Sequence, residues 1–158
     1  HEGTPYLHKN TFSRGKGKFI PAAHRFPAEV PDNEYPVILT TGRILYQYHT
    51  MTMTGKNSGL MKTAGEIYME IHPELAENLL LKQGETVKVS SRRGSIKVKA
   101  KITNKINKNT VFIPFHFAGG ANILTNNALD HFAKEPELKA CTVKIEKLYL
   151  DADCTEAR

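Results

Sequence analysis

The sequence predicts a mainly-β fold, a barrel of six to seven short strands with one or two short helices. Two observations indicate it. From Pro36 onward, short segments with strand-like apolar patterns recur between turn signals, and a single segment carries the apolar spacing of a helix. An antiparallel sandwich is the alternative. The chain of 158 residues, 40% of them hydrophobic, is long enough for one core. No apolar run approaches the roughly 20 residues of a membrane helix, so we expect no membrane insertion.

Changes in composition divide the chain into three parts. Residues 1–35 are rich in Pro, Gly and basic residues and have no sustained periodicity, so we interpret them as an extended arm lying on another surface or on the domain behind it. Residues 36–148 form the predicted barrel, and residues 149–158 form a C-terminal tail.

The predicted strands follow one another in the second part. Residues 36–43, PVILTTGR, are an apolar run that ends in Gly42 and Arg43, as in a buried strand that leads into a functional loop. Ile67, Met69 and Ile71 alternate with other residues in a second strand. The remaining strands are predicted over residues 86–91, 95–103, 109–115 and 141–148, with a tight turn at Arg93-Gly94 before the second of these.

The one predicted helix covers residues 73–84. Pro73 suits its first position, and Gly84 sits where a C-cap glycine is expected. Its apolar face would consist of Leu75, Ala76, Leu79 and Leu80.

The connection after the first strand is the most informative stretch. It is too polar and too rich in Gly and Thr for a core element, and at more than 20 residues it is longer than a plain connection. Arg43 offers a planar fork for phosphate or a ring carbonyl. Stacking faces and hydrogen-bonding groups follow it, on Tyr46, Gln47, Tyr48, His49 and Thr50. A large polar aromatic ligand would suit this set; the alternative is a solvated loop with one Tyr packed on the core.

A second candidate loop, residues 115–127 (FHFAGGANILTNN), follows the predicted strand at 109–115. Gly119-Gly120 allows close approach of a ligand to the backbone. Neutral donors and acceptors are dense here, on His116, Asn122, Thr125 and Asn126. The alternative is a turn-rich loop in which Asn and Gly only satisfy backbone geometry.

Charge and motif content exclude several function classes. The formal net charge of +6 favours an anionic partner. Cys141 and Cys154 form no C-x-x-C pair, and the histidines show no metal-binding spacing, so we expect no metal site, iron–sulfur cluster or disulfide framework. No catalytic triad is evident. The lysines of residues 88–101 alternate with apolar residues, which favours a solvated strand face over a nucleic-acid groove.

Several segments, in this order and spacing, carry a family resemblance. They are YPVILTTGRILYQYHTMTMTG, EIHPELAENLLLKQGETVKVSSRRGSIKVKAKIT, VFIPFHFAGGANILTN and EPELKACTVKIEK. Together they resemble the C-terminal molybdopterin-dinucleotide-binding domain of the molybdenum/tungsten oxidoreductases. Within that superfamily the chain is most similar to the catalytic (alpha) subunit of formate dehydrogenase, over roughly residues 4–148.

The resemblance implies a double-psi β-barrel, of the aspartate-decarboxylase-like class. It also implies a cofactor, two molybdopterin guanine dinucleotides (bis-MGD) that hold molybdenum or tungsten. By resemblance, the cofactor-binding residues are Arg43, Gln47, Tyr48, His49 and Thr50 on a first loop, Phe115, His116 and Asn122 on a second, and Lys139 on a third. These loops should converge on one rim and concentrate positive charge there, rather than along residues 95–103.

The chain departs from the family pattern at two positions. Gln47 stands where the family often has His; its amide keeps the hydrogen bonding of the imidazole but cannot carry a proton. Leu138 replaces a commoner Tyr, which removes one stacking contact.

The resemblance also implies what lies elsewhere. In the family, the metal-ligating Cys or selenocysteine, the active-site His and the iron–sulfur cysteines belong to earlier domains. The chain begins with neither Met nor a signal-like segment and is interpreted as a fragment, a cofactor-binding module inactive alone. Its expected partners are the cofactor, the other domains of the same catalytic subunit and electron-transfer subunits. The expected compartment is the cytoplasm, with the periplasm left open because a signal would lie outside the fragment.

Two alternatives to this parent enzyme stay open. The same barrel could belong to a formylmethanofuran dehydrogenase or a nitrate reductase. It could also be a non-enzymatic double-psi barrel that binds protein or nucleic acid, as in some AAA proteins, although that interpretation leaves both polar loops unexplained.

Overall fold

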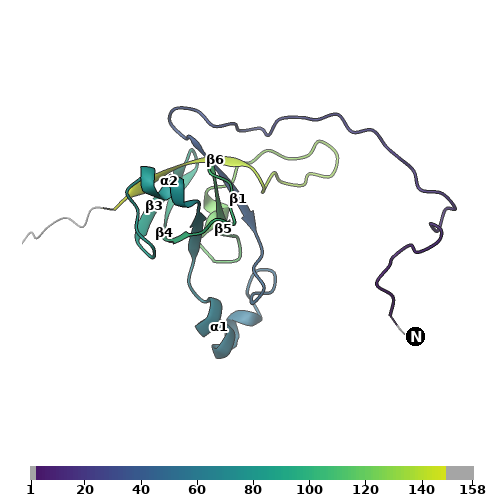
Figure 1. Cartoon of the computed structure of the whole chain (residues 1–158), viewed down its shortest axis with the longest axis horizontal. Helices are drawn as coiled ribbons and strands as arrows, with labels where there is room; N and C mark the ends of the chain where they lie inside the picture. The colour runs from purple at the N-terminus through teal and green to yellow at the C-terminus, as the bar shows by residue number, and fades with distance from the viewer. Residues whose placement is uncertain (1–2, 149–158) are drawn as a thin grey trace, which may run out of the picture.

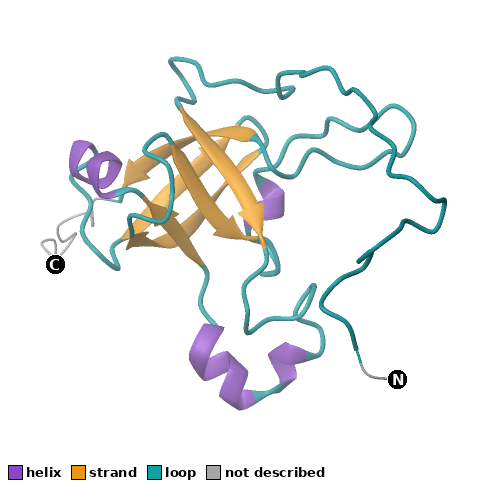
Figure 2. Cartoon of the chain, turned by 45° about the vertical axis from the view of Figure 1, so that its right-hand side comes forward, coloured by secondary structure: helices purple, strands orange, loops and turns teal. Residues whose placement is uncertain are grey.

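The computed structural model describes residues 3–148, so the predicted tail lies outside the described residues. Six strands close into a barrel in the order β1-β5-β2-β4-β3-β6 (Figures 1 and 2). The strands are β1 Val37–Gly42, β2 Tyr68–Ile71, β3 Thr86–Ser91, β4 Gly94–Ile102, β5 Thr110–Pro114 and β6 Cys141–Lys147. The helices are α1 Ser58–Ala64 and α2 Pro73–Asn78, with short 3-10 helices η1 Thr54–Lys56 and η2 Ala121–Ile123.

Strand directions define the topology of the barrel. β1 pairs with β5 and β2 with β4 in parallel, whereas the other four pairings are antiparallel. The predicted double-psi β-barrel is confirmed, with six strands, and the antiparallel sandwich is wrong.

Alternation along the strands places the core inside the barrel. On β4, Val98 and Ala100 are buried, whereas Lys97, Lys99 and Lys101 are exposed. This confirms that the lysines form a solvated strand face, because successive residues of a strand point to opposite sides. Leu39, Met69, Ile71, Val87, Val89, Val111, Ile113 and Val143 are fully buried.

The second helix is shorter than predicted. α2 ends at Asn78, and Leu80 adopts a φ of 54° with 76% of its surface exposed, so its predicted place on the apolar face is wrong. Leu80 N–H bonds the Glu77 carbonyl and Leu81 N–H bonds the Ala76 carbonyl, which is a Schellman ending. This reversal brings Leu81 into the core instead. Gly84 is not the C-cap: it has a φ of 77° in the turn before β3.

The β1–β2 connection contains a helix that the sequence did not predict. α1 begins after Asn57, whose side chain accepts a hydrogen bond from Leu60 N–H at 3.0 Å. None of its residues is buried, and in Figure 2 the connection extends away from the barrel. No residue of 44–65 belongs to the buried hydrophobic cluster, in line with the expectation that this stretch is too polar for a core element, even though it is partly helical.

The arm, of which residues 3–35 are described, has neither helix nor strand there. Its first part lies apart from the barrel, and its last residues run beside the barrel to the start of β1 (Figure 1). Large side chains on it are exposed, among them Phe19 and Phe26. Within the described residues, no helix is long and apolar enough to cross a membrane.

The barrel has two contrasting ends. The loop end consists of residues 43–67, 92–93 and 115–140, which connect β1 to β2, β3 to β4 and β5 to β6. The closed end consists of residues 72–85 and 103–109, the connections that begin after β2 and β4. All the candidate site residues named above lie at or beside the loop end.

Candidate functional site

Strand pairing brings three candidate segments together at the loop end. Because β1 and β5 are parallel, their last residues are neighbours, and Phe115 N–H donates to the Gly42 carbonyl at 3.2 Å. β6 runs antiparallel to β1, so the residues before it reach the same place. Lys139 Nζ donates to the Thr41 carbonyl at 2.6 Å. Arg43, Phe115 and Lys139 therefore gather around the end of β1.

Gly42 makes room for an aromatic ring beside this site. A Cβ at this position would lie 2.8 Å from the Phe112 ring and 3.8 Å from Lys139 Nζ. Any larger residue would displace the aromatic ring, whereas the distance to the ammonium group is an ordinary contact. The sequence marked Gly42 as the end of the strand, but its role in making room for the Phe112 ring appears only in the fold.

An aromatic series joins the first and second candidate loops. The ring centroids of Tyr48 and His49 lie 6.4 Å apart, and those of His49 and Phe115 also lie 6.4 Å apart, edge to face. Phe115 is 6.5 Å from His116, which is 4.2 Å from Phe117. Loops that are distant in sequence thus present one continuous set of rings.

His116 carries an unpaired polar atom inside this series. Its side chain is buried, and Nε2 has no hydrogen-bond partner among the described residues. Burial lowers the pKa of the imidazole, so the ring is neutral at neutral pH. A buried polar atom left without a partner costs free energy, which a bound group with a matching donor or acceptor would recover.

Two cations around the end of β1 are not neutralised by carboxylates among the described residues. Within residues 3–148, neither Arg43 nor Lys139 forms an ion pair, and the Lys139 ammonium contacts only a backbone carbonyl. Arg43, Tyr48 and Thr50 are exposed. The end is therefore suited to an anion with planar rings.

Gln47 is placed differently from its neighbours. It is buried, its Nε2 donates to the Ala64 carbonyl at 2.9 Å, and its Oε1 accepts from Thr54 Oγ1 at 2.5 Å. Both polar atoms of the amide are thus already bonded, and they attach the loop to α1. Contact between Gln47 and a ligand stays a prediction.

Asn122 lies on the β5–β6 connection. It belongs to η2, which packs on the start of β4, where a Cβ on Gly94 would lie 2.7 Å from Ile123 Cγ2. Its side chain is exposed. Gly120 leads into η2, and a Cβ there would meet the Phe117 carbonyl at 2.9 Å, so this glycine is required for packing.

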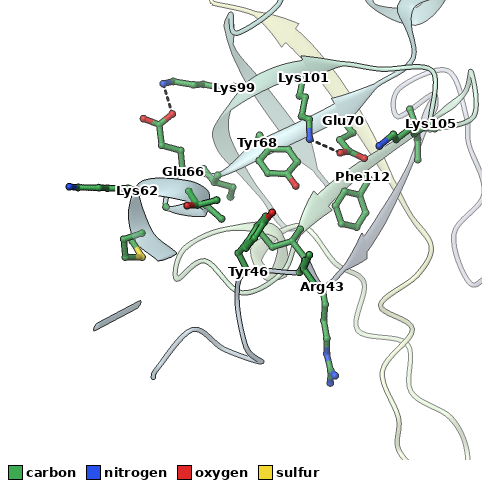
Figure 3. A pocket seen from close by; sticks show the side chains of 18 residues that line it. Arg43, Tyr46, Lys62, Glu66, Tyr68, Glu70, Lys99, Lys101, Lys105 and Phe112 are labelled. Atoms are coloured by element: carbon green, nitrogen blue, oxygen red, sulfur yellow. Dashed lines mark hydrogen bonds and ion pairs between the residues drawn. The ribbon is translucent and has the colours of Figure 1, made fainter. Parts of the chain in front are cut away.

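A large cavity lies on the flank of the barrel beside this end. It has a volume of about 1090 Å³ between the β1–β2 connection and strands β2, β4 and β5 (Figure 3). Lys99 pairs with Glu66 at 2.6 Å and Lys101 with Glu70 at 3.0 Å, so these lysines are neutralised. Arg43 also lines the cavity, and in Figure 3 its side chain extends away from them. The expected concentration of cations at one rim stays a prediction.

No metal centre is evident in residues 3–148, where no cluster of three or more His, Cys, Asp or Glu side chains could hold an ion. Cys141 is buried, and burial raises the pKa of its thiol to about 11, so it is neither a thiolate ligand nor a nucleophile at neutral pH. Cys154 lies outside the described residues.

The sequence analysis missed three residues that organise this end. Thr41 bonds the Leu138 carbonyl through its hydroxyl at 2.8 Å, and Arg93 forms an ion pair with Glu29. Only a turn was predicted at Arg93. No local signal identifies such partners, because they come from segments far apart along the chain.

Known proteins are similar to this chain in sequence. The chain is 50% identical over 151 residues to the F420-dependent formate dehydrogenase subunit alpha of Methanocaldococcus jannaschii, covering 94% of this chain and 22% of that protein. It is 45% identical over 138 residues to a nitrate reductase of Symbiobacterium thermophilum, covering 84% and 18%. The chain thus spans about a fifth of the length of these relatives.

A solved structure has the same fold. The acetylene hydratase of Pelobacter acetylenicus matches 72% of this chain and 18% of its own, with a TM-score of 0.62 and 20% sequence identity. The model of the family "Molydopterin dinucleotide binding domain" matches residues 37–142, which include strands β1 to β5 and the first two residues of β6. The chain therefore belongs to the molydopterin dinucleotide binding domain family.

Proposed function

We propose that this chain binds the guanine-dinucleotide pterin part of a bis-MGD cofactor with molybdenum or tungsten, as the C-terminal domain of a formate dehydrogenase. One observation carries the proposal: Arg43 and Lys139, which form no ion pair within residues 3–148, lie at the loop end with exposed rings and the unpaired Nε2 of His116. A guanine dinucleotide offers a matching set, a pyrophosphate, planar ring systems and many hydrogen-bonding edges.

Each group has a distinct role in this proposal. Arg43 and Lys139 hold phosphate oxygens through charge-assisted hydrogen bonds. Tyr48 and Phe115 provide ring faces, and the neutral imidazole of His116 holds a polar edge of the ligand at Nε2. The exposed amide of Asn122 adds hydrogen bonds from the β5–β6 connection.

The chain's residues position and shield the cofactor but do not react. When bound, the cofactor supplies the metal centre that accepts two electrons as formate becomes carbon dioxide. The iron–sulfur cluster and the electron-transfer subunits stay predictions about the rest of the protein. The choice of metal also stays open.

A nitrate reductase is the second candidate parent. The 45% identity to the Symbiobacterium thermophilum protein supports it, and the 50% identity to the Methanocaldococcus jannaschii subunit favours formate dehydrogenase. The proposed contacts serve either parent, because they face the cofactor and not the substrate.

An NMR titration of the isotope-labelled chain with GDP tests the proposal. The barrel closes on itself around its own core, so the chain alone is suitable. We expect amide shifts confined to residues 43–50, 115–122 and 139, with residues 72–85 unchanged. Guanosine, which lacks the pyrophosphate, should cause much smaller shifts. Shifts confined to the lysines of β4, or none at saturating GDP, would contradict the proposal.

A further inference from the structure

The arm is attached to the barrel by one carboxylate near the loop end. Glu29 Oε2 accepts from Thr142 N–H at 2.9 Å and from Arg93 Nη2 at 3.0 Å, and its Oε1 accepts from Arg93 Nη1. The side chains of Glu29 and Arg93 are 15% and 24% exposed, so water screens the pair only in part. Burial opposes ionisation of Glu29, but the hydrogen bonds from Arg93 and Thr142 outweigh it and lower the pKa of the carboxyl.

The same guanidinium also holds the β5–β6 loop. Arg93 Nε and Nη2 donate to the Leu124 carbonyl at 3.0 and 2.8 Å. Leu124 ends η2, two residues after Asn122, and its side chain is fully buried. Arg93 therefore connects the arm to the segment that presents Asn122.

A second connection joins the arm to the far part of this loop. Ala28 N–H donates to Glu137 Oε2 at 3.0 Å, and Asn126 Nδ2 donates to the same oxygen at 3.2 Å. Asn126 Nδ2 also donates to the Ala140 carbonyl at 2.8 Å, next to Lys139. Two adjacent residues of the arm thus hold the loop on both sides of residues 127–136.

We propose that Glu29 and Arg93 are positioning residues, which make the shape of the β5–β6 loop depend on the seated arm. Neither residue is required to touch a ligand. When the Glu29 carboxylate is in place, the Arg93 fork faces the Leu124 carbonyl and fixes η2. The consequence for ligand binding rests on the proposed function, since Asn122 and Lys139 belong to this loop.

Hydrogen exchange of the chain without ligand tests the positioning role. In Glu29→Gln, which keeps the size of the side chain but removes its charge, we expect amides of residues 121–140 to exchange at least tenfold faster. Amides of β1 and β5 should keep their protection. Glu85→Gln is the matched control, because Glu85 also bonds a backbone N–H, that of Lys82, and pairs with a cation, Lys147, but at the closed end.

Arg93→Lys separates geometry from charge. Lysine keeps the positive charge but has a single nitrogen, which cannot serve the Glu29 carboxylate and the Leu124 carbonyl as the guanidinium fork does. We expect Arg93→Lys to exchange as fast as Glu29→Gln in residues 121–140. The proposal would be overturned if the amides of residues 121–140 exchanged at the wild-type rate in either variant. It would also be overturned if the exchange rate rose equally throughout the barrel.

A GDP titration of Glu29→Gln tests the link to binding. We expect several-fold weaker binding than in the wild-type chain, although Glu29 is assigned no ligand contact. Equal affinities would overturn the link. If the wild-type chain binds no GDP, the proposed function fails, whereas the exchange result still decides the positioning role.

Discussion

The two ends of the barrel are built on the same six strands but differ in the side chains that they expose. At the loop end, Leu45, Tyr46, Tyr48, Met53 and Phe132 are largely exposed. At the closed end, Ala76 and Leu81 are buried against the barrel, and Leu80 is the large exposed hydrophobic residue of the connection between β2 and β3.

The difference in exposure indicates a division of roles. Buried aliphatic side chains at the closed end stabilise the fold, because each removes apolar surface from water. The loop end leaves ring faces and the Arg43 side chain exposed and the Nε2 atom of His116 without a partner among the described residues, which lowers its contribution to stability but leaves these groups available to a ligand. Substitutions at the two ends should therefore separate stability from binding.

The largest effect is expected from truncation of the core near the closed end. Ile71 is fully buried at the end of β2, so Ile71→Ala should cost about 2–5 kcal/mol of unfolding free energy. Urea denaturation measures this loss. At a temperature where the variant is still folded, its GDP shifts should match the wild type; a loss of binding by the folded variant would show that the ends are not independent.

Arg43→Ala should have the opposite effect: GDP binding should weaken while the free energy of unfolding stays nearly unchanged. Because Arg43 is exposed and forms no ion pair within the described residues, its loss should change the unfolding free energy by less than about 0.5 kcal/mol. Loss of a charge-assisted bond to phosphate should weaken GDP binding roughly ten- to a hundred-fold. Lys97→Ala, on the solvated face of β4, is the control and should bind normally. Equal weakening by both substitutions would contradict the assigned roles.

His116 should make the stability of the loop end depend on pH. Burial lowers its pKa in the folded state, so the unfolded chain binds a proton first as pH falls below about 6.5. The free energy of unfolding is therefore highest above that pH, and it decreases as pH falls through the lower pKa that His116 has in the folded state. Urea denaturation between pH 7.5 and 5.5 should show a smaller loss for His116→Gln than for the wild type. An unchanged slope would contradict this assignment.

The smallest effect concerns the turn after α2 at the closed end. Leu80 occupies the left-handed position of a Schellman ending with a φ of 54°, which costs a non-glycine residue about 1–2 kcal/mol. Glycine removes this strain but loses more backbone entropy on folding, so Leu80→Gly should stabilise the chain by about 0.5–1 kcal/mol. Thermal unfolding measures the gain. Leu80→Ala keeps a Cβ and should show none; an equal gain there would contradict the explanation.

The elements that could be predicted are those with a local cause. Alternation identified Met69 and Ile71, or Val98 and Ala100, as inward-facing positions, because a strand presents successive residues to opposite faces. The helix after Pro73 also followed from its spacing, but its end did not. Leu80 and Leu81 are identical residues, so the sequence alone does not show which of them is buried. The helix stops where it does because this ending packs Leu81 into the core and leaves Leu80 exposed.

Part of the candidate site was also within reach of the sequence. The residue types at Arg43, Tyr48 and His116 predicted a polar aromatic ligand, and the resemblance implied its class; contact of these residues with such a ligand stays a prediction. The side chain of Gln47 could not be predicted in this way. It lies in the same loop as Tyr48, yet it is buried because α1, which was not predicted, offers it the Ala64 carbonyl.

The sequence by itself determined the strand periodicity, the polar character of the two long connections and the family to which they point. Only the tertiary structure decided that Lys139 reaches the end of β1, and that Glu29 and Arg93 join the arm to the β5–β6 loop. The physical reason is how far apart along the chain the interacting residues are. Periodicity arises between residues a few positions apart, whereas these contacts depend on barrel closure, which pairs strands in an order different from that of the chain.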